Sequence, residues 1–264
     1  MAAADGPPVV TMVSALFVGV FGLIVGSFLN VCIYRLPRHE SVTWPGSHCT
    51  ACNRPLAWYE NIPVISWLVL RGRCRTCGER ISSIYPIVEA ITGAVFVASY
   101  FIYGPTPLLA ARLLFATGLI VLFFIDLRHH ILPNVITIPG AVIGFALSFL
   151  LPPGWVASLI GLIAGGGLLF AIAEAYYRWR GVEGLGMGDV KMLAMIGAFL
   201  GWQLMLVTLV LASFAGSLLG MALIASGRGT MKLALPFGTF LAVGALAAAV
   251  IGEPLLDWYL GMYQ

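Results

Sequence analysis

Two aspartates stand where long apolar runs meet polar sequence, and a pair of carboxylates at such a place can do acid–base chemistry. Asp189 follows Gly186-Met187-Gly188 and precedes an apolar run, while Asp126 ends the apolar run of residues 108–125. An ionisable side chain at the edge of the hydrocarbon is costly unless it is paired or used, so it marks a functional site. Two carboxylates that share one proton can activate a water molecule, as in aspartic proteases.

Each aspartate also has a simpler interpretation. Asp189 could be a helix N-cap, because aspartate is favoured at that position. Asp126 could be a solvated helix end near Arg128. The joint occurrence of the two aspartates favours the catalytic pair, and Gly186 and Gly188 would let the backbone approach an extended peptide. Helix polarity predicts that Asp189 acts as the base and Asp126 as the acid, although a coupled pair titrates as one unit.

Four cysteines form two C-x-x-C pairs in one polar segment. Cys49 and Cys52 make the first pair, and Cys74 and Cys77 make the second. Each pair can chelate one ion, and four thiolates close a tetrahedral structural zinc site. A short segment between two helices has too small a core to fold alone, so a metal would stabilise it. We therefore predict structural zinc at these cysteines; free thiols or a redox pair are the alternatives.

The composition places the elements that carry these residues in a membrane. The 264 residues are 60% hydrophobic and 9% charged, with a mean hydropathy of +0.99. Soluble domains are only about 45–50% apolar, so the composition predicts a polytopic membrane protein with the lipid bilayer as a partner. The net charge of +3 gives no reason to expect a nucleic-acid partner.

The apolar runs predict an all-α fold with about eight transmembrane helices. They cover residues 9–34, 84–103, 108–125, 135–151, 155–177, 190–201, 203–225 and 233–251. Residues 35–83 hold seven of the fourteen Lys and Arg residues, so the positive-inside rule makes this segment cytoplasmic. Both aspartates then lie at the cytoplasmic membrane face. Gly201 leaves open whether the sixth and seventh runs form two helices or one kinked helix.

Three parts follow from this division of the chain. Residues 1–34 form the first transmembrane helix, residues 35–83 a small zinc-stapled cytoplasmic loop domain, and residues 84–264 a transmembrane core. The core carries both aspartates.

Four further polar residues have two interpretations each. Asn30 forms an interhelical hydrogen bond or contacts substrate. His129 and His130 relay protons or are interfacial loop residues. Lys191 holds a substrate carboxylate or extends to the lipid interface.

Several stretches, taken together, resemble the bacterial type IV prepilin peptidases. They are Gly26-Ser27-Phe28-Leu29-Asn30-Val31, the double C-x-x-C, residues 61–67, 71–74 and 85–89, Asp126 with Pro133-Asn134, Gly186-Met187-Gly188-Asp189-Val190-Lys191, and Pro236-Phe237-Gly238. The Gly-x-Gly-Asp element alone is shared with presenilin-like proteases, and the combination is much more specific. The resemblance extends over residues 26–240, nearly the whole chain.

The resemblance implies a bifunctional enzyme of the bacterial inner membrane. It would cut the leader from prepilins and pseudopilins after a glycine at the cytoplasmic face, with Asp126 and Asp189 as the catalytic residues. It would then methylate the new N-terminal amine with S-adenosylmethionine, an activity that the family associates with residues 35–83. No Gly-rich fingerprint identifies the residues that bind this cofactor. Glu89 would bind the substrate amine or anchor a helix with Arg80.

Three other functions remain open on the sequence. A peptidase without methyltransferase activity is the nearest, although relatives that only cleave tend to lack the cysteine loop. A zinc-loop membrane transporter or scaffold would use the aspartates as an ion path and would place polar residues at the bilayer midplane. An aspartyl protease that cuts within the membrane is the third.

Overall fold

Helices make up nearly all the regular structure of residues 8–182, 184–227 and 235–262, the part of the chain that this computed structural model describes. The all-α prediction is therefore confirmed. The helices are α1 (Pro8–Arg35), η1 (Leu36–Arg38), η2 (Trp58–Asn61), α2 (Ile65–Val69), α3 (Ile84–Tyr103), α4 (Pro107–His129), α5 (Asn134–Leu147), α6 (Trp155–Arg180), α7 (Met187–Ala225) and α8 (Phe237–Gly261).

Six of the described helices are long and apolar enough to cross a membrane: α1, α3, α4, α6, α7 and α8. Helix α5, with 14 residues, is shorter than a typical span. Helix α7 contains two of the eight predicted runs, and they are separated at Gly201, where φ of 78° and ψ of 171° lie outside the helical region. The predicted break at Gly201 is thus present, inside one 39-residue element.

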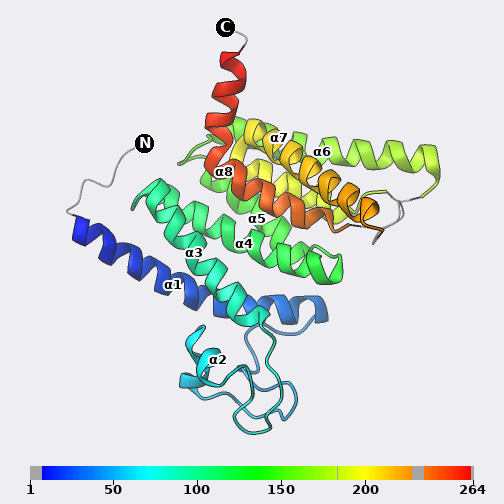
Figure 1. Cartoon of the computed structure of the whole chain (residues 1–264). Helices are drawn as coiled ribbons and strands as arrows, with labels where there is room; N and C mark the ends of the chain where they lie inside the picture. The colour runs from blue at the N-terminus through cyan, green and yellow to red at the C-terminus, as the bar shows by residue number, and fades with distance from the viewer. Residues whose placement is uncertain (1–7, 183, 228–234, 263–264) are drawn as a thin grey trace. The chain divides into compact units, whose positions relative to one another are not determined.

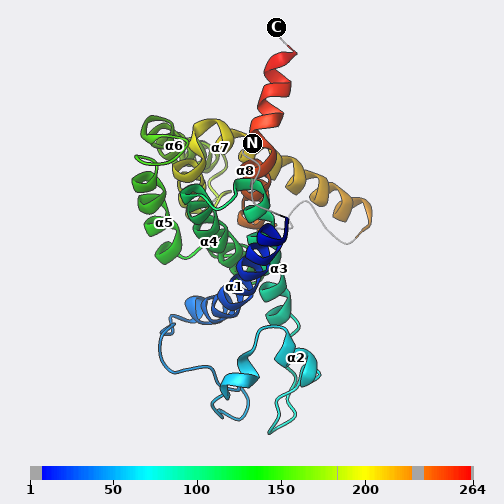
Figure 2. The same cartoon turned by 90° about the vertical axis from the view of Figure 1, so that its left-hand side faces the viewer.

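The chain divides into two compact units, residues 1–121 and 122–264. In the first unit, α1 and α3 lie side by side (Figures 1 and 2). Their backbones approach closely, because a Cβ atom added at Gly26 would lie 2.7 Å from the Cα atom of Glu89. Asn30 Nδ2 donates a hydrogen bond to the carbonyl of Tyr85 at 3.0 Å. The predicted interhelical hydrogen bond of Asn30 is therefore confirmed.

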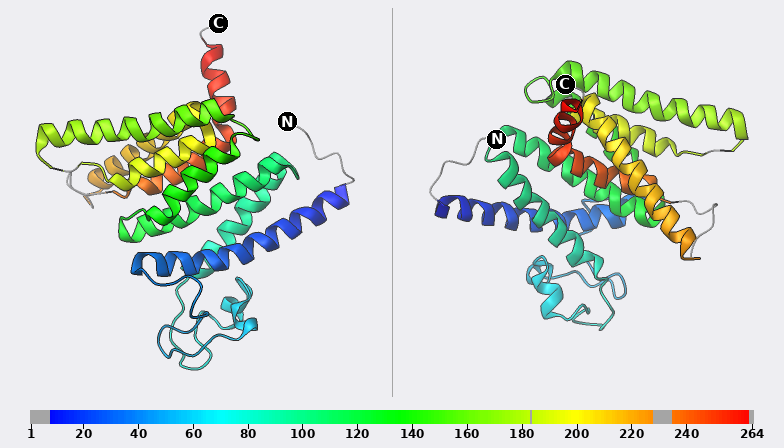
Figure 3. Two further views of the ribbon diagram at one scale, coloured as in Figure 1. Left: turned by 180° about the vertical axis from the view of Figure 1, so that it is seen from behind. Right: turned by 45° about the horizontal axis from the view of Figure 1, so that its top comes forward.

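The second unit is built around the first half of α7. Helix α6 runs beside it (Figure 3), and Gly161 of α6 and Gly197 of α7 bring the two backbones into contact. Ser158 Oγ donates across this contact to the carbonyl of Ala198 at 2.6 Å. Helices α5 and α8 also pack on α7, whose largest fully buried side chains are Met192, Leu193, Met195, Ile196 and Met205. This packing fixes the start of α7, which carries Asp189.

Two helix boundaries differ from the sequence prediction near the aspartates. Helix α4 continues to His129, so Asp126 lies inside its last turns and does not end it. Helix α8 covers Phe237–Gly261 where the apolar run predicted residues 233–251; residues 233 and 234 lie outside the described part. The polar residues after Ile251 did not stop the helix.

Candidate active site and metal centre

Asp126 is almost fully enclosed at the end of α4 in the second unit. Only 5% of the surface of this residue is exposed. The carboxylate oxygen Oδ2 accepts a hydrogen bond from the backbone N–H of Thr239 at 2.8 Å. Thr239 is the third residue of α8, so the N-terminus of one helix holds a carboxylate near the C-terminus of another.

Asp189 is the third residue of α7 and is half-buried. The N-cap of α7 is Gly186, which shows that the alternative interpretation of Asp189 as an N-cap is wrong. The backbone N–H of Asp189 donates to the carbonyl of Gly186 at 3.1 Å. The carboxylates of Asp189 and Asp126 lie close enough to interact electrostatically. The structure thus brings the two predicted catalytic residues to one place.

Leu132, in the connection between α4 and α5, packs between the ends of two helices. A Cβ atom added at Gly188 would lie 2.9 Å from Leu132 Cβ, and one added at Gly238 would lie 2.9 Å from Leu132 Cδ1. One side chain therefore contacts the first turns of both α7 and α8. These are the two turns that carry Asp189 and the hydrogen-bond donor to Asp126.

Lys191 and the two histidines lie around the same ends. Lys191 Nζ donates to Asn134 Oδ1 at 2.9 Å, which links the start of α7 to the start of α5. His129 and His130 are both exposed, and the backbone N–H of His130 donates to the carbonyl of Asp126 at 2.9 Å. Both residues therefore have access to solvent beside the carboxylate pair.

The arrangement suits hydrolysis by general acid and base. Asp126 is held by the backbone N–H of Thr239, and Asp189 is the more exposed of the two. Two interacting carboxylates at one site can divide the work, one removing a proton from water while the other supplies a proton to the leaving group.

The four predicted zinc ligands also come together, in the first unit. The Sγ atoms of Cys49, Cys52, Cys74 and Cys77 all lie within 4.8 Å of one another, and all four are free thiols. The Sγ atoms of Cys49 and Cys77 are 3.8 Å apart. A tetrahedral zinc ion with Zn–S bonds of about 2.3 Å requires sulfur atoms about 3.8 Å apart. The cluster is compatible with zinc.

Backbone amides prepare Cys74 for metal binding. The N–H groups of Cys77 and Thr76 donate to its sulfur and lower the pKa of the Cys74 thiol to about 6, while the pKa of the neighbouring Cys77 thiol is raised to about 12, so Cys74 is the first of the two to lose its proton. A metal ion binds the thiolate, so a lowered pKa reduces the cost of deprotonation at neutral pH.

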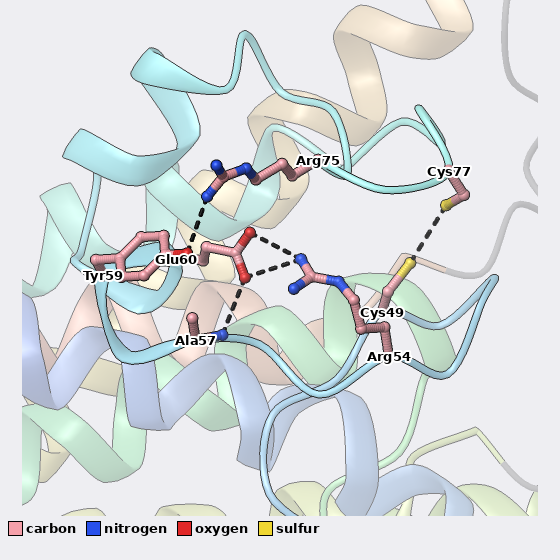
Figure 4. A network of polar contacts seen from close by, with 7 residues as sticks. All are labelled: Cys49, Arg54, Ala57, Tyr59, Glu60, Arg75 and Cys77. Carbon is pink, nitrogen blue, oxygen red and sulfur yellow. Dashed lines mark hydrogen bonds and ion pairs between the residues drawn. The ribbon is translucent and has the colours of Figure 1, made fainter.

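An ion pair between Arg54 and the buried Glu60, which sequence reasoning missed, supports the first cysteine pair (Figure 4). Glu60 is only 7% exposed, and its two carboxylate oxygens accept from Arg54 Nη2 at 2.7 and 2.8 Å. It also accepts from the backbone N–H of Ala57 at 2.9 Å. The Arg54 carbonyl in turn accepts from the N–H of Cys49 at 2.9 Å. No local motif marks this pair, because only folding brings the two side chains together.

Glu89 connects the loop to α3. It is 7% exposed, and its Oε2 accepts from the backbone N–H of Val64 at 2.7 Å. Val64 has a φ of 60°, an unusual value for a β-branched residue. Of the two roles considered for Glu89, this contact favours an anchor, with the loop backbone as its partner in place of Arg80.

Comparison with known protein families finds a match for each half of the chain. Residues 20–103 match the bacterial peptidase A24 N-terminal domain, and residues 113–221 match the type IV leader peptidase family. The first match contains the cysteine cluster, and the second contains both aspartates. No solved structure matches the chain.

Curated relatives agree with these matches. A protein of Myxococcus xanthus (strain DK1622) is 47% identical over 220 residues, which are 81% of this chain and 64% of that relative. One of Aeromonas hydrophila is 37% identical over 267 residues, 91% of each chain. Both are named prepilin leader peptidase/N-methyltransferase. This chain therefore belongs to the type IV leader peptidase family.

Proposed function

We propose that this protein cleaves the leader peptide from type IV prepilins and pseudopilins at the cytoplasmic membrane face and then methylates the new N-terminal residue. Asp126 and Asp189 are the catalytic pair for cleavage. The observation that carries the proposal is that Leu132 packs against the first turns of both α7 and α8, which carry Asp189 and the hydrogen-bond donor to Asp126. The names of the relatives supply the substrate class.

Cleavage follows from the different surroundings of the two carboxylates. Asp189, the more accessible one, removes a proton from a water molecule as its oxygen attacks the scissile carbonyl carbon. Asp126 supplies a proton to the nitrogen as the C–N bond breaks, and since α8 holds its Oδ2, the proton is carried on Oδ1. The products are a leader with a free carboxylate and a pilin with a new N-terminal amine.

We assign the second reaction to residues 35–83, which lie inside the matched N-terminal domain of residues 20–103. S-adenosylmethionine, when bound, would supply the methyl group: its methyl–sulfur bond would break and release S-adenosylhomocysteine, while the new amine would gain the methyl group and lose one proton. Zinc held by Cys49, Cys52, Cys74 and Cys77 would keep residues 35–83 folded for this step. Glu89 fixes the loop to α3 through Val64.

The experiment uses the purified full chain, a prepilin with a Gly-Phe junction, and S-adenosylmethionine. Mass spectrometry of the product should give a pilin that is shortened at this bond and heavier by one methyl group. A shortened product without the methyl group would reduce the function to a peptidase. An uncut prepilin would contradict the proposal and would favour the alternative in which the aspartates form an ion path of a transporter.

A further inference from the structure

The first turn of α8 lies directly against Asp126, and the mechanism proposed above uses this contact only to decide which carboxylate oxygen carries the proton. We propose that the backbone N–H of Thr239 is a positioning group for the Asp126 carboxylate, and that Gly238 is the residue which lets α8 approach closely enough. This inference rests on the proposed function, since it adds a third part, the start of α8, to the site of peptide cleavage.

The hydrogen bond has the features of a strong and protected contact. The Thr239 nitrogen is 2.8 Å from Asp126 Oδ2, and each residue is only 5% exposed. The first N–H groups of a helix lack partners within the helix and favour a negative charge. A bond from such a group to a carboxylate is charge-assisted, and water does not compete for it here.

The turn itself is held in a fixed conformation. Thr239 Oγ1 donates to the carbonyl of Pro236 at 2.7 Å, and Pro236 is the N-cap of α8. The Thr239 nitrogen lies 3.3 Å from the same carbonyl, which is longer than its distance to Asp126. The shorter contact is therefore the one to the carboxylate.

Gly238 leaves the space that the side chains of Asp126 and Leu132 occupy. A Cβ atom at this position would lie 2.9 Å from Asp126 Oδ2, and 2.9 and 3.0 Å from the two methyl carbons of Leu132. Contacts this short do not occur between real atoms of these types, so an added methyl group would push the turn away from Asp126 or displace Leu132. Because Leu132 also contacts Gly188, the displacement would reach the turn that carries Asp189.

The proposal predicts a defect in the chemical step. Without the N–H of Thr239, the Asp126 carboxylate keeps only the backbone hydrogen bond from Gly238, and the geometry that proton transfer to the leaving nitrogen requires is held less of the time. The peptide-binding contacts of the prepilin remain, so kcat should fall while KM changes little. A group that only supports folding would not lower kcat while leaving KM nearly unchanged.

The first test compares Thr239→Pro with Thr239→Val in the full chain. Proline is tolerated in the first turn of a helix. It puts a ring carbon in place of the N–H hydrogen that points at Asp126, so the hydrogen bonds to Asp126 and to the Pro236 carbonyl are both lost, together with the hydroxyl. Valine also removes the hydroxyl but keeps the N–H. We expect Thr239→Pro to lower kcat for prepilin cleavage by about tenfold or more, with KM within about twofold. Thr239→Val should recover most of that loss.

The second test uses Gly238→Ala, with Gly216→Ala as the matched control. Gly216 lies in α7, and its added Cβ would meet Phe240 at an ordinary 3.5 Å. Gly238→Ala should reduce kcat by about tenfold or more, whereas Gly216→Ala should cleave like the wild type. This variant keeps the proposal testable if the proline protein fails to fold, which thermal unfolding in detergent would detect.

Two outcomes would overturn the inference. One is a wild-type kcat in Thr239→Pro or Gly238→Ala, which would show that the N–H is not used. The other is an equal loss in Thr239→Pro and Thr239→Val, which would assign the effect to the hydroxyl. Failure of the wild-type protein to cleave is a separate result, and it would contradict the proposed function itself.

Discussion

At the scale of single residues, three buried carboxylates are each held by identified hydrogen-bond donors. Asp126 is held by Thr239, Glu89 by Val64, and Glu60 by Arg54 and Ala57. Each acid is more than nine-tenths buried, where a charge without partners would be very costly. In all three cases a backbone N–H supplies one hydrogen bond. For Asp126 and Glu89 this N–H belongs to a distant segment, so the position of the acid depends on the fold, whereas for Glu60 it lies three residues away.

The Arg54–Glu60 pair should control how firmly the cysteine cluster retains its metal. The hydrogen bond from Arg54 is the largest of the interactions that hold the pKa of Glu60 below its ordinary value. Glu60→Ala would leave Arg54 without this partner and loosen the segment that follows Cys52. We expect a chelator to remove zinc about tenfold faster from this variant than from the wild type. The absorbance of a metal-sensitive dye would measure the rate. Glu40→Ala, an exposed acid of the same segment, is the matched control.

The pH dependence of this effect has a defined sign. A carboxyl with a lowered folded-state pKa contributes stability that is present above its unfolded-state pKa and is lost as pH falls through its folded-state pKa. The difference in metal retention between the wild type and Glu60→Gln should therefore be largest near neutral pH and become smaller in acid. A difference that grew in acid would contradict the role of the ionised pair.

Helix ends bring the candidate site together at the scale of elements. The C-terminal part of α4 meets the N-terminal turns of α7 and α8, with Leu132 between those turns, while Lys191 and Asn134 link α7 to α5. A carboxylate beside a helix N-terminus is stabilised by the N–H groups there. The site thus depends on where each helix starts and stops.

Gly201 should be essential to the shape of α7. Its φ of 78° and ψ of 171° lie in a region that only glycine adopts without strain, and an added Cβ would be 3.0 Å from Pro153 Cβ. Gly201→Ala should cost about 1–3 kcal/mol of stability and lower the temperature of thermal unfolding. Gly216→Ala, within the helical part of α7, should leave that temperature unchanged or slightly higher. Equal unfolding temperatures for the two variants would contradict this account.

The sequence indicated the elements well and their boundaries less well. Apolar runs of span length predicted the long helices, and the break at Gly201 was visible because glycine follows a short run. The continuation of α4 from Asp126 to His129 was not visible, because Asp126, Arg128 and His129 interrupt the apolar pattern. Such residues are compatible with a helix that extends beyond the hydrocarbon.

The chemistry-bearing residues were predictable, but their supports were not. Asp126, Asp189 and the cysteines stand out by type and spacing. Thr239, Leu132 and the Arg54–Glu60 pair do not, since their roles come from a backbone N–H, a packing contact and a pairing that only the fold creates. Pro236-Phe237-Gly238 was noticed as a family stretch, yet nothing in the sequence connects it to Asp126.

At the scale of the whole molecule, the two proposed chemistries divide between the two units. The aspartate pair, Leu132 and the start of α8 belong to residues 122–264, and the cysteine cluster belongs to residues 1–121. The two family matches divide in nearly the same way, at residues 20–103 and 113–221. Removing the acid chemistry should therefore leave methyl transfer intact.

The most direct measurement follows single-turnover cleavage of a prepilin by Asp126→Asn and Asp189→Asn. Asp257→Asn, an exposed aspartate of α8, is the control, and each protein is also given pilin that has already been cut, with S-adenosylmethionine. We expect both dyad variants to lose cleavage by about a thousandfold or more while they still methylate the cut pilin, and the control to do both. Wild-type cleavage by either dyad variant would show that Asp126 and Asp189 are not the catalytic pair.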